Sequence, residues 1–156
     1  RGVALRRRVG RLTLNSMVTI YGTAQVDALE RMGAERSDAA SFFGGEWVRF
    51  AYATVGGANV EGFLFLEAGL LTAHLFTINN LNAGPAGIAL VRFRRRALDL
   101  ATALGLSSVE LQGGTVINQH VASWLGGLGF GRKVANAPEQ LGGGTQEVFF
   151  LQVKLP

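Results

Sequence analysis

The sequence LLTAHLFTINNLNAGPAG, from Leu70 to Gly87, joins an unbroken apolar run to a polar turn that contains glycine. The run Leu70–Ile78 has the length and composition of a strand that is buried on both faces. An amphipathic helical pattern follows over Pro85–Leu104, with proline in the first turn, where its missing N–H leaves no donor unpaired. The segment SVELQ, Ser108–Gln112, has the pattern of a second strand. Strand, turn, helix and strand predict a crossover unit whose two strands lie parallel.

The turn between this strand and this helix suits an anionic ligand. Its glycines, Gly84 and Gly87, let a backbone approach an anion closely, and the N–H groups at a helix N-terminus carry partial positive charge toward it. Gly-Pro-Ala-Gly is also the sequence of an ordinary loop. A phosphate-binding turn and a plain connection therefore both remain open from this segment alone.

The order of the motifs in this part of the chain resembles that of a known family. The segment Leu81–Ala86, LNAGPA, fits the frame Gln/Arg-x-x-Gly-x-Gly/Ala, with glycine and alanine in the small-residue positions. After the second strand come Asn118, a helical pattern and the tripeptide Leu128-Gly129-Phe130. From about Val60 to its C-terminus the chain is similar to the GNAT superfamily of N-acetyltransferases, more in order and spacing than in any single motif.

This resemblance implies an enzyme that transfers an acyl group from acetyl-CoA, or another acyl-CoA, directly to an amine. The first crossover strand would pair with the pantetheine arm like an added strand, and the turn after it would hold the pyrophosphate. The residues to which the resemblance assigns cofactor contacts are Phe76, Thr77, Ile78, Asn82, Ala83, Gly84, Ala86, Gly87 and Asn118. The acceptor is predicted only as a class, which includes small-molecule, RNA-linked and protein amines.

Two positions depart from the family's pattern. Leu81 stands where the family usually has Arg or Gln, so one polar group near the pyrophosphate is absent. Leu125, with Trp124 beside it, occupies the place of the tyrosine that often serves as general acid, and neither side chain can donate a proton at neutral pH. A non-catalytic domain of the same fold, within a larger assembly or a virion, therefore remains an alternative.

The candidate catalytic residues lie on the two crossover strands. An amine must lose a proton before it attacks a thioester, so a nearby base is useful. His74 lies in the middle of the first strand and Glu110 in the second. His74 equally suits a core histidine with one hydrogen-bonded nitrogen, and Glu61 and Glu67, on the strand before it, suit exposure to solvent. The sequence has no metal-ligand spacing, no Ser-His-Asp grouping and no nucleotide triphosphate loop.

The net charge of +4 comes largely from two arginine clusters. One lies near the N-terminus, and the other lies on the long helix at Arg92, Arg94, Arg95 and Arg96. Such clusters suit an anionic partner, nucleic acid included, although periodicity alone favours a solvated helix face for the second. No apolar stretch reaches membrane-spanning length, so we expect a soluble protein without a membrane partner and favour a cytoplasmic location.

The remaining segments predict one domain over residues 11–156, after a basic arm over residues 1–10. A first strand is expected at Arg11–Gly22, followed by a helix that Thr23 caps and a second short helix that Ser37 opens. The other predicted elements are strands at Glu46–Val55, Val60–Ala68, Gly131–Ala137 and Thr145–Pro156, and a last helix at Ile117–Phe130 with Val121, Leu125 and Leu128 inward. The fold class is α/β (α+β): a GNAT-like mixed, mostly antiparallel central sheet with a β-α-β crossover and helices on both faces. Val148–Val153 is expected to form an exposed edge that could pair two copies as a homodimer.

Overall fold

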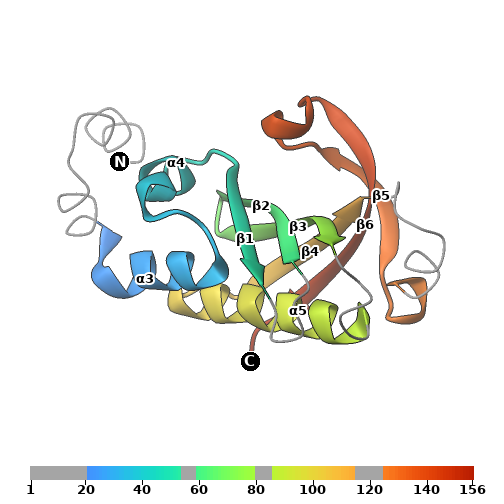
Figure 1. Cartoon of the computed structure of the whole chain (residues 1–156), viewed down its shortest axis with the longest axis horizontal. Helices are drawn as coiled ribbons and strands as arrows, with labels where there is room; N and C mark the ends of the chain where they lie inside the picture. Colours follow the sequence, from blue (N-terminus) through green and yellow to red (C-terminus); the bar gives the residue numbers. More distant parts are fainter. Residues whose placement is uncertain (1–20, 54–58, 80–85, 115–124) are drawn as a thin grey trace.

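A computed structural model describes residues 21–53, 59–79, 86–114 and 125–156 of the chain. These residues build a six-stranded sheet in the order β1-β2-β3-β4-β6-β5 (Figure 1). The strands are β1 (Val48–Ala53), β2 (Asn59–Glu67), β3 (Leu70–Asn79), β4 (Ser108–Gly114), β5 (Gly131–Asn136) and β6 (Thr145–Lys154). All six predicted strands that fall within the described residues begin and end within two residues of the prediction.

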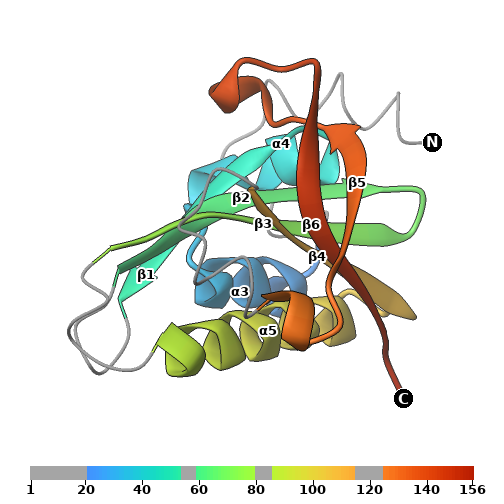
Figure 2. The same ribbon diagram turned by 90° about the vertical axis from the view of Figure 1, so that its right-hand side faces the viewer.

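The pairing of the strands confirms the predicted fold class. Every neighbouring pair is antiparallel except β3 and β4, which run parallel and are joined by the helix α5 (Ala86–Ala103). Figure 2 shows α5 and α3 (Thr23–Met32) below the sheet and α4 (Ala39–Phe43) above it. The mixed, mostly antiparallel sheet, the crossover and the helices on both faces are therefore all present.

The main apolar core lies between the sheet and the helices α3 and α5. Alternation along the strands sends one set of side chains to this face, where Phe50 stacks on Phe93 of α5 with ring centroids 5.9 Å apart. The fully buried apolar residues of this layer include Val26, Leu29, Met32, Leu64, Leu71, Ala73, Ala97, Leu100, Val109 and Leu111. The opposite face of β3 and β4 carries buried polar residues instead, and these matter for the site below.

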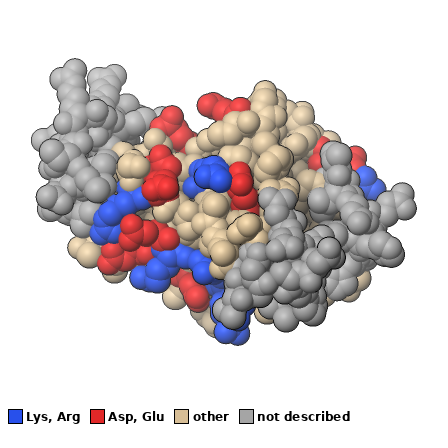
Figure 3. Space-filling view, viewed as in Figure 1, with Lys and Arg blue, Asp and Glu red and all other residues tan. Residues whose placement is uncertain are grey.

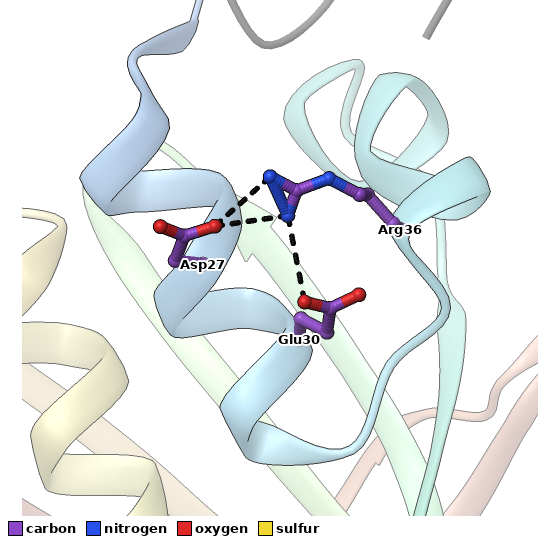
Figure 4. Close-up of polar contacts among 3 residues, drawn as sticks. All are labelled: Asp27, Glu30 and Arg36. Atoms are coloured by element: carbon purple, nitrogen blue, oxygen red, sulfur yellow. Dashed lines mark hydrogen bonds and ion pairs between the residues drawn. The ribbon is translucent and has the colours of Figure 1, made fainter.

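A short ion-pair cluster connects α3 to the 3₁₀ turn η1 (Arg36–Asp38) that precedes α4. Both terminal nitrogens of Arg36 lie 2.9 Å from Oδ1 of Asp27, and Nη1 lies 3.5 Å from Oε1 of Glu30 (Figure 4). The three side chains are partly exposed, so each pair contributes at most about 1 kcal/mol. The cluster orients η1 on α3 more than it stabilises the fold.

Four local predictions need correction or lie outside the described residues. Gly22, not Thr23, is the N-cap of α3, and its lack of a side chain means that no side-chain cap is made. Tyr21 and Gly22 are not in a strand, and the rest of the predicted first strand, like the arm over residues 1–10, lies outside the described residues. Of the predicted last helix, Leu125 is buried as expected, but Leu128 is 51% exposed. Within the described segments, no helix is long and apolar enough to cross a membrane.

The prediction that Val148–Val153 forms a free edge is wrong for its first half. The strand β6 lies between β4 and β5, and residues Val148–Phe150 pair with both neighbours. The hairpin of β5 and β6 places the later strand inward, so the pattern of β6 alone could not indicate its position in the sheet. A homodimer remains a prediction, but it cannot use those three residues.

Candidate active site where two parallel strands part

The parallel strands β3 and β4 separate before either of them ends. Their pairing runs from Leu71 opposite Val109 to Leu75 opposite Gly113 and goes no further. Beyond that point β3 continues beside β2 as far as Asn79, whereas β4 continues beside β6. The two strands of the crossover therefore diverge at the end nearest the N-terminus of α5 (Figure 1).

A β-bulge lies at the point where the strands part. On the side of β2, Gly62 pairs with Leu75 and Glu61 pairs with Thr77, so that Phe76 is the extra residue of β3. Bulges bend a strand and increase its twist, and they terminate regular pairing. The bulge at Phe76 thus accounts for the departure of β3 from β4.

The predicted cofactor contacts on β3 all lie beyond this point. Phe76 is 46% exposed and its ring centroid lies 6.1 Å from that of Phe63. Thr77 and Ile78 follow it in the same strand. Of the other predicted contacts, Ala86 and Gly87 begin α5, whereas Asn82, Ala83, Gly84 and Asn118 lie outside the described residues.

The two predicted catalytic residues belong to one hydrogen-bonded network. Nδ1 of His74 lies 3.1 Å from Oε1 of Gln112, whose Nε2 donates to Oε2 of Glu110 over 2.6 Å. Nζ of Lys133, on β5, donates to the other carboxylate oxygen of Glu110 over 2.7 Å. His74, Gln112 and Glu110 are all buried, and the network crosses from β3 through β4 to the outer strand β5.

The direction of these hydrogen bonds fixes the tautomer of His74. The carboxylate of Glu110 can only accept, so the amide of Gln112 turns its N–H to Glu110 and its oxygen to the imidazole. Nδ1 of His74 therefore carries the proton, and Nε2 carries the lone pair. Burial lowers the pKa of His74, against a smaller opposing effect of the bond to Gln112. The neutral imidazole is thus favoured near pH 7, and it is a proton acceptor rather than a donor.

Gln112 and Lys133 were missed by the sequence-based reasoning. Gln112 lies two residues after Glu110 in a strand, so alternation alone places both side chains on one face. Their partner across the parallel pairing is His74, opposite Gln112. Lys133 carried no such signal, because its contact with Glu110 depends on the order of strands that are distant in sequence.

A pocket of about 340 Å³ opens on the same face of the sheet. We call it the sheet-face pocket; its lining includes Trp47, Phe65, Thr72, Gln112, Lys133 and Asn136. Gln112 and Lys133 connect it to the buried network. Its volume is within the lower part of the range of small-molecule sites.

Aromatic side chains form one wall of the sheet-face pocket. The ring of Trp47 stacks on Phe65 with centroids 4.8 Å apart, and it meets His74 edge-on at 6.4 Å. Glu67 also lines the pocket and is exposed.

Glu61, the other carboxylate considered on β2, lies 2.9 Å from Nε of Arg49, and this bond lowers the pKa of Glu61. Glu61 is therefore engaged in an ion pair and is a poor base.

The lowered pKa of His74 predicts a loss of stability in mild acid. A group whose pKa is lower in the folded state binds fewer protons there than in the unfolded state. The stability that His74 contributes is therefore complete above the unfolded pKa of 6.5, and it declines as the pH falls toward the folded pKa. We expect the free energy of unfolding to decrease between neutral pH and about pH 5. His74→Asn, which keeps a donor near the position of Nδ1, should flatten this dependence in denaturant titrations. If the free energy of unfolding depends on pH equally in the parent and in His74→Asn, His74 is not the group responsible. His120→Asn, at the other histidine, is the control.

Two kinds of catalytic group are not found among the described residues. No three His, Cys, Asp or Glu side chains there gather as a metal site. Leu125, in the place that the resemblance gives to a tyrosine general acid, is buried against the core. The described part of the site thus offers a proton acceptor and a carboxylate–lysine pair, but no tyrosine donor at that place.

Comparison with known proteins gives a likeness at the level of three-dimensional structure alone. No protein-family model and no curated protein matches the chain in sequence. Solved structures that resemble it include nourseothricin acetyltransferase, at 13% identity over 71% of this chain and 66% of that one, with a TM-score of 0.38. The ribosomal-protein-S18-alanine N-acetyltransferase from Escherichia coli is 14% identical over 83% of this chain and 86% of its own, with a TM-score of 0.39.

A third structure, an acetyltransferase of the GNAT family from Streptococcus pneumoniae, is 14% identical over 92% of this chain and 96% of its own. Its TM-score is 0.37. TM-scores below 0.5 carry no argument about function. The proposal that follows therefore rests on the sheet and the site of this chain.

Proposed function

We propose that the protein is an acyl-CoA-dependent N-acyltransferase of the GNAT type, with acetyl-CoA as the first donor to test. The observation that carries this proposal is the parting of β3 from β4 after Leu75, beside the bulge at Phe76 and the buried network at His74. An opening between two parallel strands suits an extended ligand, because the diverging strand offers backbone groups in the manner of β-strand addition.

The residues present fit the arm of an acyl-CoA. The strand β3 continues past its last pairing with β4 through Phe76, Thr77 and Ile78, which are the residues that the resemblance assigns to the pantetheine arm. Ala86 and Gly87 begin α5, whose first N–H groups suit the pyrophosphate. Bound acyl-CoA would supply a thioester carbonyl and a thiolate leaving group.

His74 would act as the base for the amine. The bond from Nδ1–H to Gln112 leaves the lone pair on Nε2, where it can accept the proton that the amine loses as its nitrogen attacks the carbonyl. Glu110 and Lys133 would hold the amide of Gln112 in the orientation that fixes this tautomer. The sheet-face pocket, with its aromatic wall and Glu67, is the candidate place for the amine acceptor.

A non-catalytic domain of the same fold is the second candidate function, and two observations favour it. His74 is only 1% exposed and lies against Trp47, and Leu125 is buried in the place of the usual tyrosine. Such a domain would either bind CoA without catalysing acyl transfer or have lost both CoA binding and catalysis. Binding and turnover therefore have to be measured separately.

The test is isothermal titration of the protein with acetyl-CoA, beside the variant Gly84→Val. If the turn before α5 holds the pyrophosphate, a branched side chain at Gly84 should weaken binding by about 1–3 kcal/mol through lost charge-assisted hydrogen bonds. The melting temperature of the variant serves as the control, because this substitution is expected to leave the fold intact.

The outcomes of this titration distinguish the acyltransferase from the non-catalytic domain. No detectable binding at millimolar acetyl-CoA would remove the acyltransferase proposal. A folded Gly84→Val protein that binds acetyl-CoA like the parent would show that the phosphates lie elsewhere. Binding without release of free CoA across small-molecule, RNA-linked and protein amines would favour the non-catalytic domain.

A further inference from the structure

A groove lined by arginine side chains lies between α3 and α5, away from the parting strands. Its volume is about 310 Å³, and Ala28, Met32 and Leu100 line it together with charged residues. The charged residues of the groove are Arg31, Arg92, Arg95, Arg96 and Asp99. We call it the arginine groove. Figure 3 shows Lys and Arg side chains along the lower border of the molecule, with Asp and Glu side chains between them.

The arginines of this groove form no ion pair with any described residue. The ion pairs of the described chain engage Arg36, Arg49, Arg132 and Lys133. Asp99 lines the groove but does not come within ion-pair distance of the arginines there. Four guanidinium groups thus face one carboxylate, and this part of the surface keeps an excess of positive charge.

Arg96 is held in place by two contacts at its guanidinium group. Its guanidinium carbon lies 4.0 Å above the centre of the Tyr52 ring, and Nη1 donates to the carbonyl of Arg31. Burial raises the pKa of Tyr52 to about 12, with smaller opposing effects of Arg96 and Arg92. The phenol therefore stays neutral at physiological pH and supplies no negative charge to the groove.

The like charges of the arginine groove favour an anionic ligand. Arg92 and Arg96 are four residues apart on one helix, a spacing at which like charges destabilise the helix. Guanidinium groups bind phosphate through paired, charge-assisted hydrogen bonds. A volume of about 310 Å³ is at the small end of ligand sites, so it suits a compact anion better than a large molecule.

We propose that the arginine groove binds a compact phosphate-bearing ligand, such as a small phosphorylated metabolite. The arginines come from both helices and surround a concave site, whereas a nucleic-acid surface would be expected to use an exposed stripe of one helix. Arg94, the next residue along α5, lines a different cavity with Leu90 and Leu128. This inference does not depend on acyl transfer, because the groove lies along the middle of α5 and not at the turn before it.

The experiment compares Arg95→Gln with Arg94→Gln, which removes the same charge from a neighbouring exposed side chain on the other side of α5. Inorganic pyrophosphate is the probe, measured by calorimetry and thermal shift at about 0.15 M salt, where exposed charges are well screened. We expect pyrophosphate to raise the melting temperature of the parent. Arg95→Gln should lose about tenfold or more in affinity, and Arg94→Gln should stay within about twofold of the parent.

Three outcomes would overturn the proposal. The first is absence of pyrophosphate binding, and the second is an equal loss in both variants, which indicates a general effect of surface charge. In the first case, binding of a single-stranded oligonucleotide would show that the surface serves nucleic acid instead. The third is displacement of pyrophosphate by acetyl-CoA, which would make the groove part of the cofactor site. Unchanged pyrophosphate affinity in saturating acetyl-CoA supports a separate site, and the proposal survives even if acetyl-CoA itself does not bind.

Discussion

Replacing Gly62 by alanine is expected to destabilise the protein by more than about 3 kcal/mol, the upper end of the usual cost of overpacking. A Cβ built on Gly62 would lie 2.1 Å from the carbonyl oxygen of His74 and 2.7 Å from the ring of Phe50. The nearest obstacle is backbone within a paired strand, so no side-chain rotation can relieve the contact. The absence of a side chain at Gly62 lets β2 and β3 approach each other beside the bulge at Phe76.

Denaturant unfolding of Gly62→Ala beside Gly114→Ala tests this expectation. A Cβ at Gly114, also in a strand, would meet none of the described residues within 4 Å, so the control should be neutral or slightly stabilising. The difference between the two variants isolates the collision from the general effect of replacing glycine. Similar midpoints for both variants would mean that β2 and β3 do not approach so closely at the bulge.

The elements of the crossover could be predicted because their signals are local. The apolar run of β3, the stripe on α5 and the alternation in β4 each lie within one segment, and the predicted and observed limits agree closely. The order of strands is not local. Nothing in the pattern of β6 indicates that it inserts between β4 and β5, and the expected free edge at Val148–Phe150 failed for this reason.

The candidate site was predictable only in part, for the same physical reason. His74 and Glu110 were identifiable because a titratable side chain within a buried strand requires an explanation. The bulge at Phe76 depends on the register between β2 and β3, which no single segment contains. The bridge through Gln112 needs the parallel pairing of β3 with β4, and the contribution of Lys133 needs the position of β5 as well.

This bridge has a consequence for stability that differs from its proposed chemical role. Glu110 is 4% exposed, and its carboxylate accepts hydrogen bonds from Nε2 of Gln112 and from Nζ of Lys133, of which only the lysine carries the opposite charge. The lysine side chain is 37% exposed, so water reaches its ammonium group but hardly reaches the carboxylate. Removing the lysine therefore leaves a buried charge with one hydrogen bond, whereas removing the carboxylate leaves a cation that water can solvate.

Lys133→Met is expected to cost about 3 kcal/mol of stability, near the lower end of the range for breaking a buried pair because the lysine is partly solvated. Methionine retains the aliphatic stem, so the change tests the charge more than the packing. The ammonium group also lies 4.5 Å from the centre of the Phe150 ring, a contact that accounts for about 0.5–1 kcal/mol of the loss. Lys154→Met, at an exposed position near the end of β6, is the matched control and should change stability by less than about 0.5 kcal/mol.

The double variant Glu110→Gln with Lys133→Met identifies the cause of the loss. A neutral amide at position 110 keeps an oxygen that can accept from Gln112, and it no longer leaves a charge buried without its partner. We therefore expect the double variant to be more stable than Lys133→Met alone, with a coupling of about 1–3 kcal/mol in the double-mutant cycle. If the two losses simply add, Lys133 and Glu110 do not interact in solution, and the network that orients Gln112 toward His74 lacks its outer support.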